Sequence, residues 1–199
     1  MNIRITKVTG KAISPYIKDL ARLRIRIFRD FPYLYDGSLE YEEKYLSTYL
    51  KSGESIIVLV KDGDVVVGAS SAMPMESETL EVQAPFLRAG IRPAEVFYFG
   101  ESLLMKEYRG KGFGHAFFDK REAWAMSLNR FRQCAFCAVE RPVDHPLRPP
   151  DYVPLDVFWT KRGYVKRPEM ITHFSWQDID KDRETDKPMV FWTRELPEQ

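Results

Sequence analysis

The stretch Arg109-Gly110-Lys111-Gly112-Phe113-Gly114 decides the predicted fold of this 199-residue chain. An apolar run over residues 95–105 precedes it and predicts a strand, and a helical pattern to about residue 129 follows it. The first N–H groups of a helix have no partner inside the helix, and the helix dipole adds partial positive charge there. Glycines allow the backbone to approach a ligand closely. The stretch therefore predicts an anion-binding turn, to which Arg109 and Lys111 add positive charge.

Two common phosphate-binding motifs do not fit this spacing. A P-loop requires G-x-x-x-x-G-K-[ST], and no such string occurs in the chain. A dinucleotide-binding fold requires G-x-G-x-x-G and an acidic residue about 20 positions later, whereas this chain has glycines at 110, 112 and 114 and then Arg130-Phe131-Arg132. The pattern that fits is [RQ]-x-x-G-x-[GA], met by Arg109, Gly112 and Gly114.

Strand and helix patterns alternate along the rest of the chain. Strands are expected over residues 2–8, 55–61, 65–73, 95–105, 133–139, 170–176 and 189–193. Helices are expected over 14–28, from 39, over 79–88, from the glycine turn to 129, and over 155–162. The charged segment 178–187 is expected to form a solvated hairpin tip. This order predicts a mixed α/β fold in a single domain.

The glycine motif and its surroundings resemble the GNAT superfamily of N-acetyltransferases, whose motif binds the pyrophosphate of acetyl-CoA. Tyr108 before the arginine is common in that family, and residues 157–164 are similar to its F-Y-x-[RK]-x-G-[FY] helix, which closes over the cofactor arm. The resemblance covers nearly the whole chain. It implies one GNAT-like domain over residues 1–199, with a mixed central sheet flanked by helices. It also implies acetyl transfer from acetyl-CoA to a primary amine by direct attack.

The resemblance further implies which residues contact the cofactor. The family's central strand splays from its neighbour and offers free backbone groups, which here implies the Leu104 N–H as oxyanion donor. His115 either joins the phosphate site or is an ordinary first-turn histidine. The expected cofactor-binding residues are Leu103, Leu104, Met105, Arg109, Gly110, Lys111, Gly112, Phe113, Gly114, His115 and Phe158.

The acid–base residues of the reaction are less well defined. Many relatives use a glutamate of the central strand as general base, and Glu101 is the only acid well inside that predicted strand. It is either that base or a carboxylate paired with a nearby cation, and strand alternation places it opposite Leu104 unless a bulge intervenes. Relatives often have a tyrosine as general acid where this chain has Trp159. Tyr152 is the candidate substitute, and unassisted departure of the thiolate is the alternative.

Acceptor pockets in this superfamily usually form from the first two helices and the loop after the fifth strand. The candidate acceptor-binding residues are Tyr33, Tyr35 and Asp36, with Glu40, Asp144 and His145 nearby. Aromatic and carboxylate groups would suit a cationic amine. Tyr41, Tyr45 and Tyr49 share one helical face, which is either part of this pocket or a packing stripe.

Composition sets the remaining expectations. The formal net charge of +1 lacks the basic excess of nucleic-acid-binding proteins. No apolar run is long enough to span a membrane, and no signal-peptide pattern opens the chain, so a cytoplasmic location is expected. Cys134 and Cys137 lie in an apolar run and point to opposite strand faces, which predicts buried thiols that share neither a disulfide nor a metal. A covalent acyl carrier at one of these cysteines is the alternative. The rival function is a non-catalytic acyl-CoA-binding or sensor domain, and a homodimer is left open.

Overall fold

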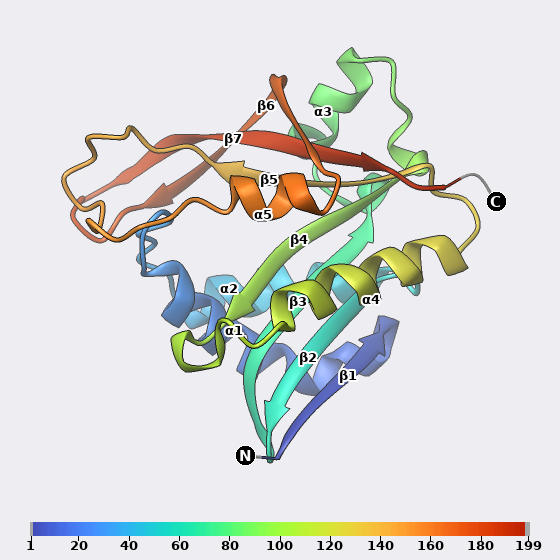
Figure 1. Cartoon of the computed structure of the whole chain (residues 1–199), viewed down its shortest axis with the longest axis horizontal. Helices are drawn as coiled ribbons and strands as arrows, with labels where there is room; N and C mark the ends of the chain where they lie inside the picture. The colour runs from blue at the N-terminus through green and yellow to red at the C-terminus, as the bar shows by residue number, and fades with distance from the viewer. Residues whose placement is uncertain (1, 198–199) are drawn as a thin grey trace.

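A seven-stranded sheet forms the centre of the computed structural model, which describes residues 2–197 (Figure 1). Residues 1 and 198–199 of the predicted domain lie outside the described part. The strand order is β1-β2-β3-β4-β5-β7-β6, and β4–β5 is the parallel pair among antiparallel neighbours. The strands are β1 (Ile3–Thr9), β2 (Ile56–Asp62), β3 (Val65–Pro74), β4 (Val96–Leu104), β5 (Gln133–Val139), β6 (Val165–Gln177) and β7 (Glu184–Glu195). The predicted mixed sheet is therefore confirmed.

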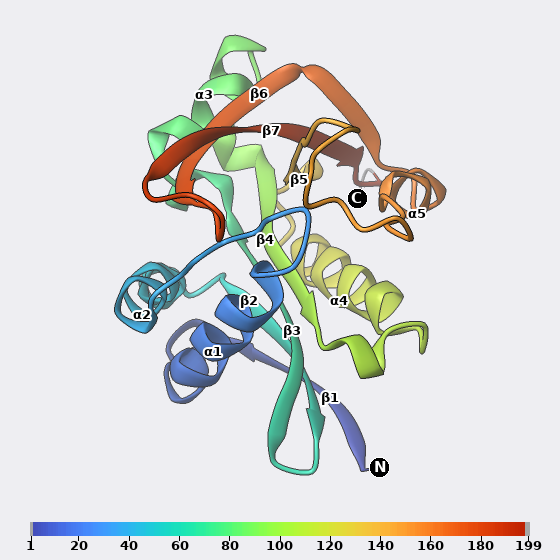
Figure 2. The same cartoon turned by 90° about the vertical axis from the view of Figure 1, so that its left-hand side faces the viewer.

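Helices cover both faces of this sheet, as Figures 1 and 2 show. The helices are α1 (Ile17–Phe28), α2 (Leu39–Leu46), α3 (Leu80–Arg88), α4 (Phe113–Ser127) and α5 (Asp156–Lys161). Phe117 and Phe118 of α4 pack with Phe97 and Phe99 of β4 on one face. Helices α1 and α2 pack on the other face, where Leu20 is buried. Among the described residues, no helix combines the length and apolar character needed to cross a bilayer.

Strands β4 and β5 separate soon after they begin. Their pairing covers residues 96–98 of β4 and 133–135 of β5, although β4 continues to Leu104 and β5 to Val139. Figure 2 shows β4 descending away from β5, so the sheet opens into a V. Beyond Tyr98 and Ala135 the facing backbone edges have no strand partner, which leaves backbone polar groups for other partners.

A bulge in β4 sets the direction of the side chains beside this gap. Ser70 of β3 pairs with Ser102 and Ala72 pairs with Phe99, so β4 carries one extra residue between these pairs. The buried guanidinium of Arg121, on α4, donates from Nη1 to the carbonyl oxygens of Ser71 and Glu101 at 3.2 and 3.1 Å. The Arg121 guanidinium thus stabilises the bulge by donating hydrogen bonds to backbone carbonyl groups that are not paired between the strands.

Glycine is required at the bulge because the backbone passes close to a buried hydroxyl pair. A Cβ atom on Gly100 would lie 2.0 Å from Tyr49 Oη and 2.7 Å from Ser71 Oγ. Past this point Glu101 faces Arg24 of α1, whereas Leu104 packs in the core beneath α4. The expectation that Glu101 and Leu104 lie on opposite faces is confirmed, and the bulge does not bring them together.

Several local predictions need correction. Residues 10–16 form a 3-10 turn, so the first α-helix starts at Ile17 rather than at residue 14. The solvated hairpin tip predicted over 178–187 is wrong at both ends, because Asp178 and Lys187 are buried and form an ion pair at 3.3 Å. The last two strands also extend beyond their predicted ranges. Charged residues can lie in the buried part of the β6–β7 hairpin because the Asp178–Lys187 ion pair offsets the cost of burying each charge.

The tyrosine stripe is only partly a packing surface. Helix α2 ends at Leu46, and Tyr49 lies in the following 3-10 turn η2 (Ser47–Lys51), fully buried. Tyr45 packs edge-on against Tyr49 with ring centroids 6.2 Å apart, whereas Tyr41 is 58% exposed. The helix stops before the third tyrosine, so the three side chains do not continue as one face.

Candidate active site

The predicted phosphate-binding turn lies at the start of α4. Gly110 and Gly112 have φ angles of +75° and +84°, which favour glycine strongly. No side chain caps the first N–H groups of α4, and its first turn contains no acidic residue. An uncapped helix start with positive-φ glycines fits an anionic group, because free N–H donors and the helix dipole converge there.

Helix α5 packs directly over this turn. The ring of Phe158 lies 3.5 Å from the position of a Cβ atom on Gly114 and 4.9 Å, between centroids, from the ring of His115. Arg162 fixes the arrangement by pairing with Asp119 at 2.7 Å and Glu122 at 3.0 Å on α4. The segment singled out over 157–164 therefore lies where it can cover a ligand bound at the helix start.

The end of β4 directs backbone groups into the gap. Met105 N–H donates to Val67 O on β3 at 3.0 Å, and strand alternation turns the Leu104 N–H and C=O away from β3. The Leu104 carbonyl accepts a hydrogen bond from Arg109 Nε at 3.1 Å. Arg109 thus links the glycine turn to the strand end, and the Leu104 N–H faces the side where β5 has separated.

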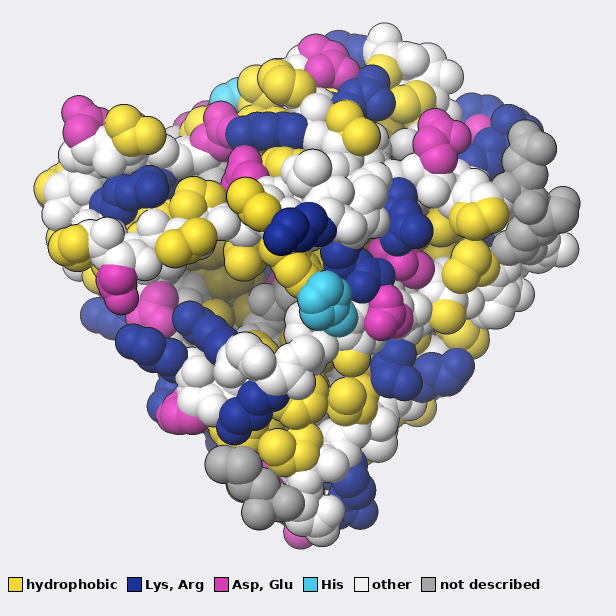
Figure 3. All heavy atoms as spheres, in the orientation of Figure 1, with side chains coloured by type: hydrophobic (Ala, Val, Ile, Leu, Met, Phe, Trp, Pro, Cys, Tyr) yellow, Lys and Arg dark blue, Asp and Glu magenta, His cyan; other side chains and the backbone are white. Residues whose placement is uncertain are grey.

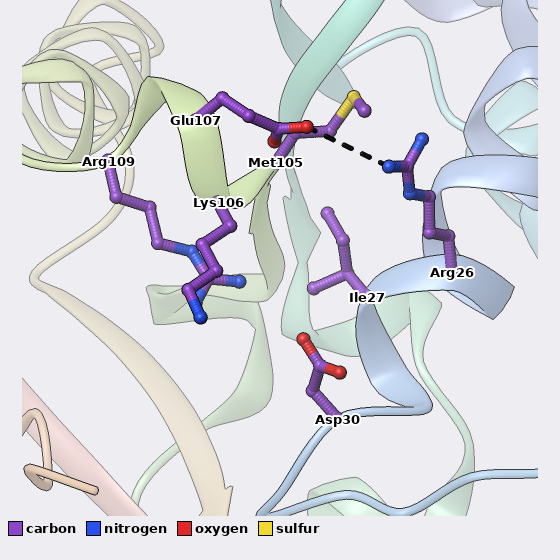
Figure 4. A pocket seen from close by; sticks show the side chains of 7 residues that line it. All are labelled: Arg26, Ile27, Asp30, Met105, Lys106, Glu107 and Arg109. Atoms are coloured by element: carbon purple, nitrogen blue, oxygen red, sulfur yellow. Dashed lines mark ion pairs between the residues drawn. The ribbon is translucent and has the colours of Figure 1, made fainter. Parts of the chain in front are cut away.

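Figure 3 shows a hollow on this face, between the part formed by α5 and β5 and the part formed by α1 and the end of β4. One cavity of about 490 Å³ lies beside the glycine turn. Figure 4 shows the side chains of Lys106 and Arg109 pointing into it, across from Asp30, which lies just after the end of α1. Glu107 pairs with Arg26 at 3.8 Å at its rim. The side chains of Lys106 and Arg109, beside an uncapped helix start, give this end of the gap a positive lining.

A second cavity of about 530 Å³ lies on the α1–α2 face. It adjoins the first across the end of α1, since Ile27 lines one cavity and Phe28 the other. Its lining includes Tyr98 and Cys137, which lie beside the point where β4 and β5 part. The cavity therefore meets the gap from the face opposite α4.

The expected acceptor-binding residues line this second cavity. Tyr33, Tyr35 and Asp36 all contribute to it, together with Glu101. The loop that carries them is held in place because Arg141 donates to Tyr33 O at 2.8 Å, while its guanidinium also pairs with Asp178. Glu40, Asp144 and His145 do not line it, whereas Tyr41 and Tyr45 do.

The carboxylate of Glu101 is paired with a cation. Its Oε2 lies 2.7 Å from Arg24 Nη1, and Arg24 Nε also pairs with the buried carboxylate of Glu42. All three side chains are nearly inaccessible to solvent. The contacts of Glu101 are thus those of a carboxylate paired with a cation. The Arg24 guanidinium pairs with both the Glu42 and the Glu101 carboxylate.

Glu78 is a cavity residue that the sequence reasoning missed. It follows β3 and precedes α3, and it lines the second cavity. Burial raises the pKa of Glu78 to about 7, and the charge of Glu101 acts in the same direction. Its Oε1 atom is buried without a hydrogen-bond partner. Nothing in Met75-Glu76-Ser77-Glu78 distinguishes this glutamate from Glu76, so only the fold reveals it.

The candidate general acid lies apart from this cavity. Tyr152 packs edge-on against Phe31 at 4.7 Å and is not among the residues that line either cavity. Trp159 packs against Phe136 and Trp192 with centroid separations of 5.0 and 5.2 Å. Tyr164 is buried against Phe136 in the same aromatic cluster and donates to Glu122.

Both cysteines are buried thiols, as predicted, on opposite sides of β5. Burial raises the pKa of Cys137 to about 12 and raises that of Cys134 further, which disfavours the nucleophilic thiolate. Within residues 2–197, no group of three or more His, Cys, Asp or Glu side chains has the geometry to hold a metal ion.

Comparisons with known proteins place the fold. No family model matches the chain, and no curated protein sequence matches it. Solved structures match over almost the full length. A GNAT-family acetyltransferase from Staphylococcus aureus Mu50 has 12% identity, covers 98% of this chain and 100% of its own, and gives a TM-score of 0.59. Ribosomal-protein-alanine N-acetyltransferase from Brucella melitensis has 13% identity, coverage of 97% and 99%, and a TM-score of 0.59.

An acetyltransferase from Thermus thermophilus has 14% identity, covers 98% of each chain and gives a TM-score of 0.57. Identities this low establish similarity of architecture only. The mixed seven-stranded sheet flanked by helices agrees with that architecture. The chain therefore has the fold of the GNAT-family acetyltransferases.

Proposed function

We propose that this protein is an N-acetyltransferase that uses acetyl-CoA and a cationic primary amine, with a cytoplasmic location. The observation that carries the proposal is the gap between β4 and β5. An uncapped helix start adjoins it on the α4 side, and an aromatic, acidic cavity meets it on the α1–α2 side. Two substrates that enter a gap from opposite faces meet with their reacting groups side by side, which favours direct transfer.

Each part of the site has a chemical role in this proposal. The N–H groups at the start of α4, with Arg109 and Lys111, bind the pyrophosphate of acetyl-CoA. The Leu104 N–H is the oxyanion donor, since it faces the gap and belongs to a rigid strand end. Acetyl-CoA supplies the activated acetyl group when bound. Phe158 covers the phosphate end and limits access of water.

The second cavity binds the amine. Its carboxylates outnumber its one buried guanidinium, and its lining includes Tyr33 and Phe28 beside them. A protonated amine is stabilised by both kinds of group, through charge pairing and cation–π contact. The Asp36 carboxylate at the rim pairs with Arg29 at 2.7 Å, so it contributes less net charge than the buried groups do.

The assay is release of CoA thiol from acetyl-CoA with a panel of diamines, polyamines, amino acids and N-terminal peptides. We expect thiol release with at least one cationic amine, and a rise in the melting temperature with acetyl-CoA alone. Absence of any thermal shift at millimolar acetyl-CoA would contradict cofactor binding altogether.

A second candidate function is acyl-CoA binding without catalysis. It is favoured by the pairing of Glu101 with Arg24, by the packing of Trp159 in the aromatic core, and by the position of Tyr152 outside both cavities. Under this alternative acetyl-CoA raises the melting temperature, but no amine in the panel releases thiol. The two readouts together separate the candidates.

A further inference from the structure

Glu78 has an unsatisfied carboxylate oxygen at the cavity that the proposed acceptor occupies. Its Oε2 accepts from the Thr79 N–H at 3.3 Å, whereas Oε1 is shielded from water and has no hydrogen-bond partner. A buried ionised oxygen without a hydrogen-bond donor is unfavourable, because it has lost its hydration without gaining a partner. Such a group is satisfied either by binding a proton or by a donor that enters with a ligand.

The surrounding charges do not provide that donor. Arg24 is the buried cation of the cavity, and it is already shared by Glu42 and Glu101. Arg24, Glu42 and Glu101 together carry a net charge of −1 when all three are ionised, and an ionised Glu78 adds a further negative charge. The charged groups that act on Glu78 are Arg24 of α1 and Glu101 of β4. The titratable groups that in turn experience the charge of Glu78 are Tyr45 of α2, Tyr49 of η2, Tyr98 of β4 and Cys137 of β5.

This setting distinguishes Glu78 from Glu101 as a proton acceptor. Protonation of Glu101 would weaken its 2.7 Å ion pair and unbalance a buried guanidinium, which is costly. Protonation of Glu78 breaks no ion pair and satisfies an orphaned oxygen. The raised pKa of Glu78, about 7, also suits a group that exchanges a proton at neutral pH.

We propose that Glu78 is the general base of the acetyl transfer, binding the ammonium group of a cationic acceptor and accepting its proton. The inference rests on the proposed acetyltransferase function. The ammonium transfers one proton to the Glu78 carboxylate, which later releases it to solvent. The freed amine nitrogen forms the C–N bond as the C–S bond of the thioester breaks. The second nitrogen proton is lost to the departing CoA sulfur, so that the products are the amide and CoA thiol.

The segment that carries Glu78 is separate from the elements that form the glycine turn. Residues 75–95 form an excursion between β3 and β4 that includes α3, and Thr172 of β6 donates to Glu81 O at 2.9 Å to hold it. The base is therefore held by an element that lies apart from the glycine turn. Changes at Glu78 should alter proton transfer and amine binding while leaving the cofactor site intact.

The test is the pH dependence of kcat/KM for the best amine of the thiol-release panel, measured for the wild type, Glu78→Gln, Glu78→Asp and Glu76→Gln. We expect Glu78→Gln to lower kcat at least about 100-fold and to remove the rise in rate through pH 7. Glu78→Asp should keep that rise with a smaller loss of rate. Glu76 is a matched control, because it lies two residues away and pairs with Arg130 at the surface.

The possible results distinguish failure of the Glu78 assignment from failure of the acetyltransferase proposal. If Glu78→Gln keeps kcat/KM within about threefold of the wild type, with the same acid limb, Glu78 is not the base although the acetyltransferase proposal stands. If the wild-type protein releases no thiol with any amine, the proposed function and the base assignment both fail. An unchanged KM for acetyl-CoA in Glu78→Gln would show that the variant is folded, so that its loss of rate supports the inference.

Discussion

Substitution of Gly100 by alanine tests whether the bulge in β4 depends on close packing against a buried hydroxyl. A Cβ atom there would lie 2.0 Å from Tyr49 Oη, and real Cβ contacts essentially never fall below 3.0 Å, so the oxygen must retreat by about 1 Å. That retreat breaks the 2.8 Å hydrogen bond between Tyr49 Oη and Ser71 Oγ. Overpacking costs about 1–3 kcal/mol, and the lost hydrogen bond about 1 kcal/mol. We therefore expect Gly100→Ala to lower the free energy of unfolding by about 2–4 kcal/mol.

Removal of the clashing oxygen should restore part of this loss. In the Tyr49→Phe background the nearest ring atom, at the Cζ position, lies 3.3 Å from the new Cβ, although Ser71 Oγ remains at 2.7 Å. Urea unfolding followed by tryptophan fluorescence gives the four free energies of the cycle. We expect the double variant to lose at least about 1 kcal/mol less than the sum of the single losses. Gly53→Ala is the control, since no atom lies within 4 Å of a Cβ there. Additive losses would refute the proposed clash.

Three further predictions follow from the same geometry. Gly112→Ala meets no atom within 4 Å but forces an alanine to φ +84°, so we expect a loss of about 1–2 kcal/mol of stability together with weaker acetyl-CoA binding by calorimetry; unchanged binding would argue against a phosphate site there. The folded-state pKa of Glu78, about 7, lies above its unfolded value, so the native state binds the extra proton and its stability falls as pH rises from about 4.3 to 7. Glu78→Gln should flatten that part of the stability curve and be about 1–3 kcal/mol more stable than the wild type at pH 8 by urea unfolding, whereas parallel curves for the two proteins would contradict the raised pKa. Cys134 and Cys137 should resist a thiol reagent until urea unfolds the protein, because burial raises the pKa of both thiols; rapid labelling of the native protein would be inconsistent with that burial.

The fold was predictable because its strongest local signals agree with its architecture. Apolar runs and the glycine cluster place most strands and helices within a few residues of their observed positions. The glycine turn, where we propose that the cofactor binds, was predictable for the same reason, since a helix start and positive-φ glycines are local properties. The boundaries that were wrong depend on distant partners. Lys187 is charged, yet it is buried because Asp178 and backbone oxygens surround it.

The acceptor end of the site could be predicted only in part. The family resemblance assigns Tyr33, Tyr35 and Asp36 to an acceptor pocket, and these residues do line one cavity together with Glu101. The contribution of Glu78 depends on burial and on charges from other elements, neither of which a single sequence reveals. Pairing of Glu101 with Arg24, 77 residues away, is equally invisible before the chain is folded. Charge balance within a cavity is therefore the property that the sequence could not predict.

The central claim is that acetyl-CoA binds in the gap between β4 and β5 with its pyrophosphate at the start of α4. The most direct measurement is a titration of ¹⁵N-labelled protein with acetyl-CoA, followed by backbone amide NMR. We expect saturable shifts concentrated on the amides of residues 110–115 and on Leu104, with small changes in α3, which lies on β6 away from the glycine turn (Figure 1). Saturable binding that leaves the amides of residues 110–115 unchanged would contradict the claim.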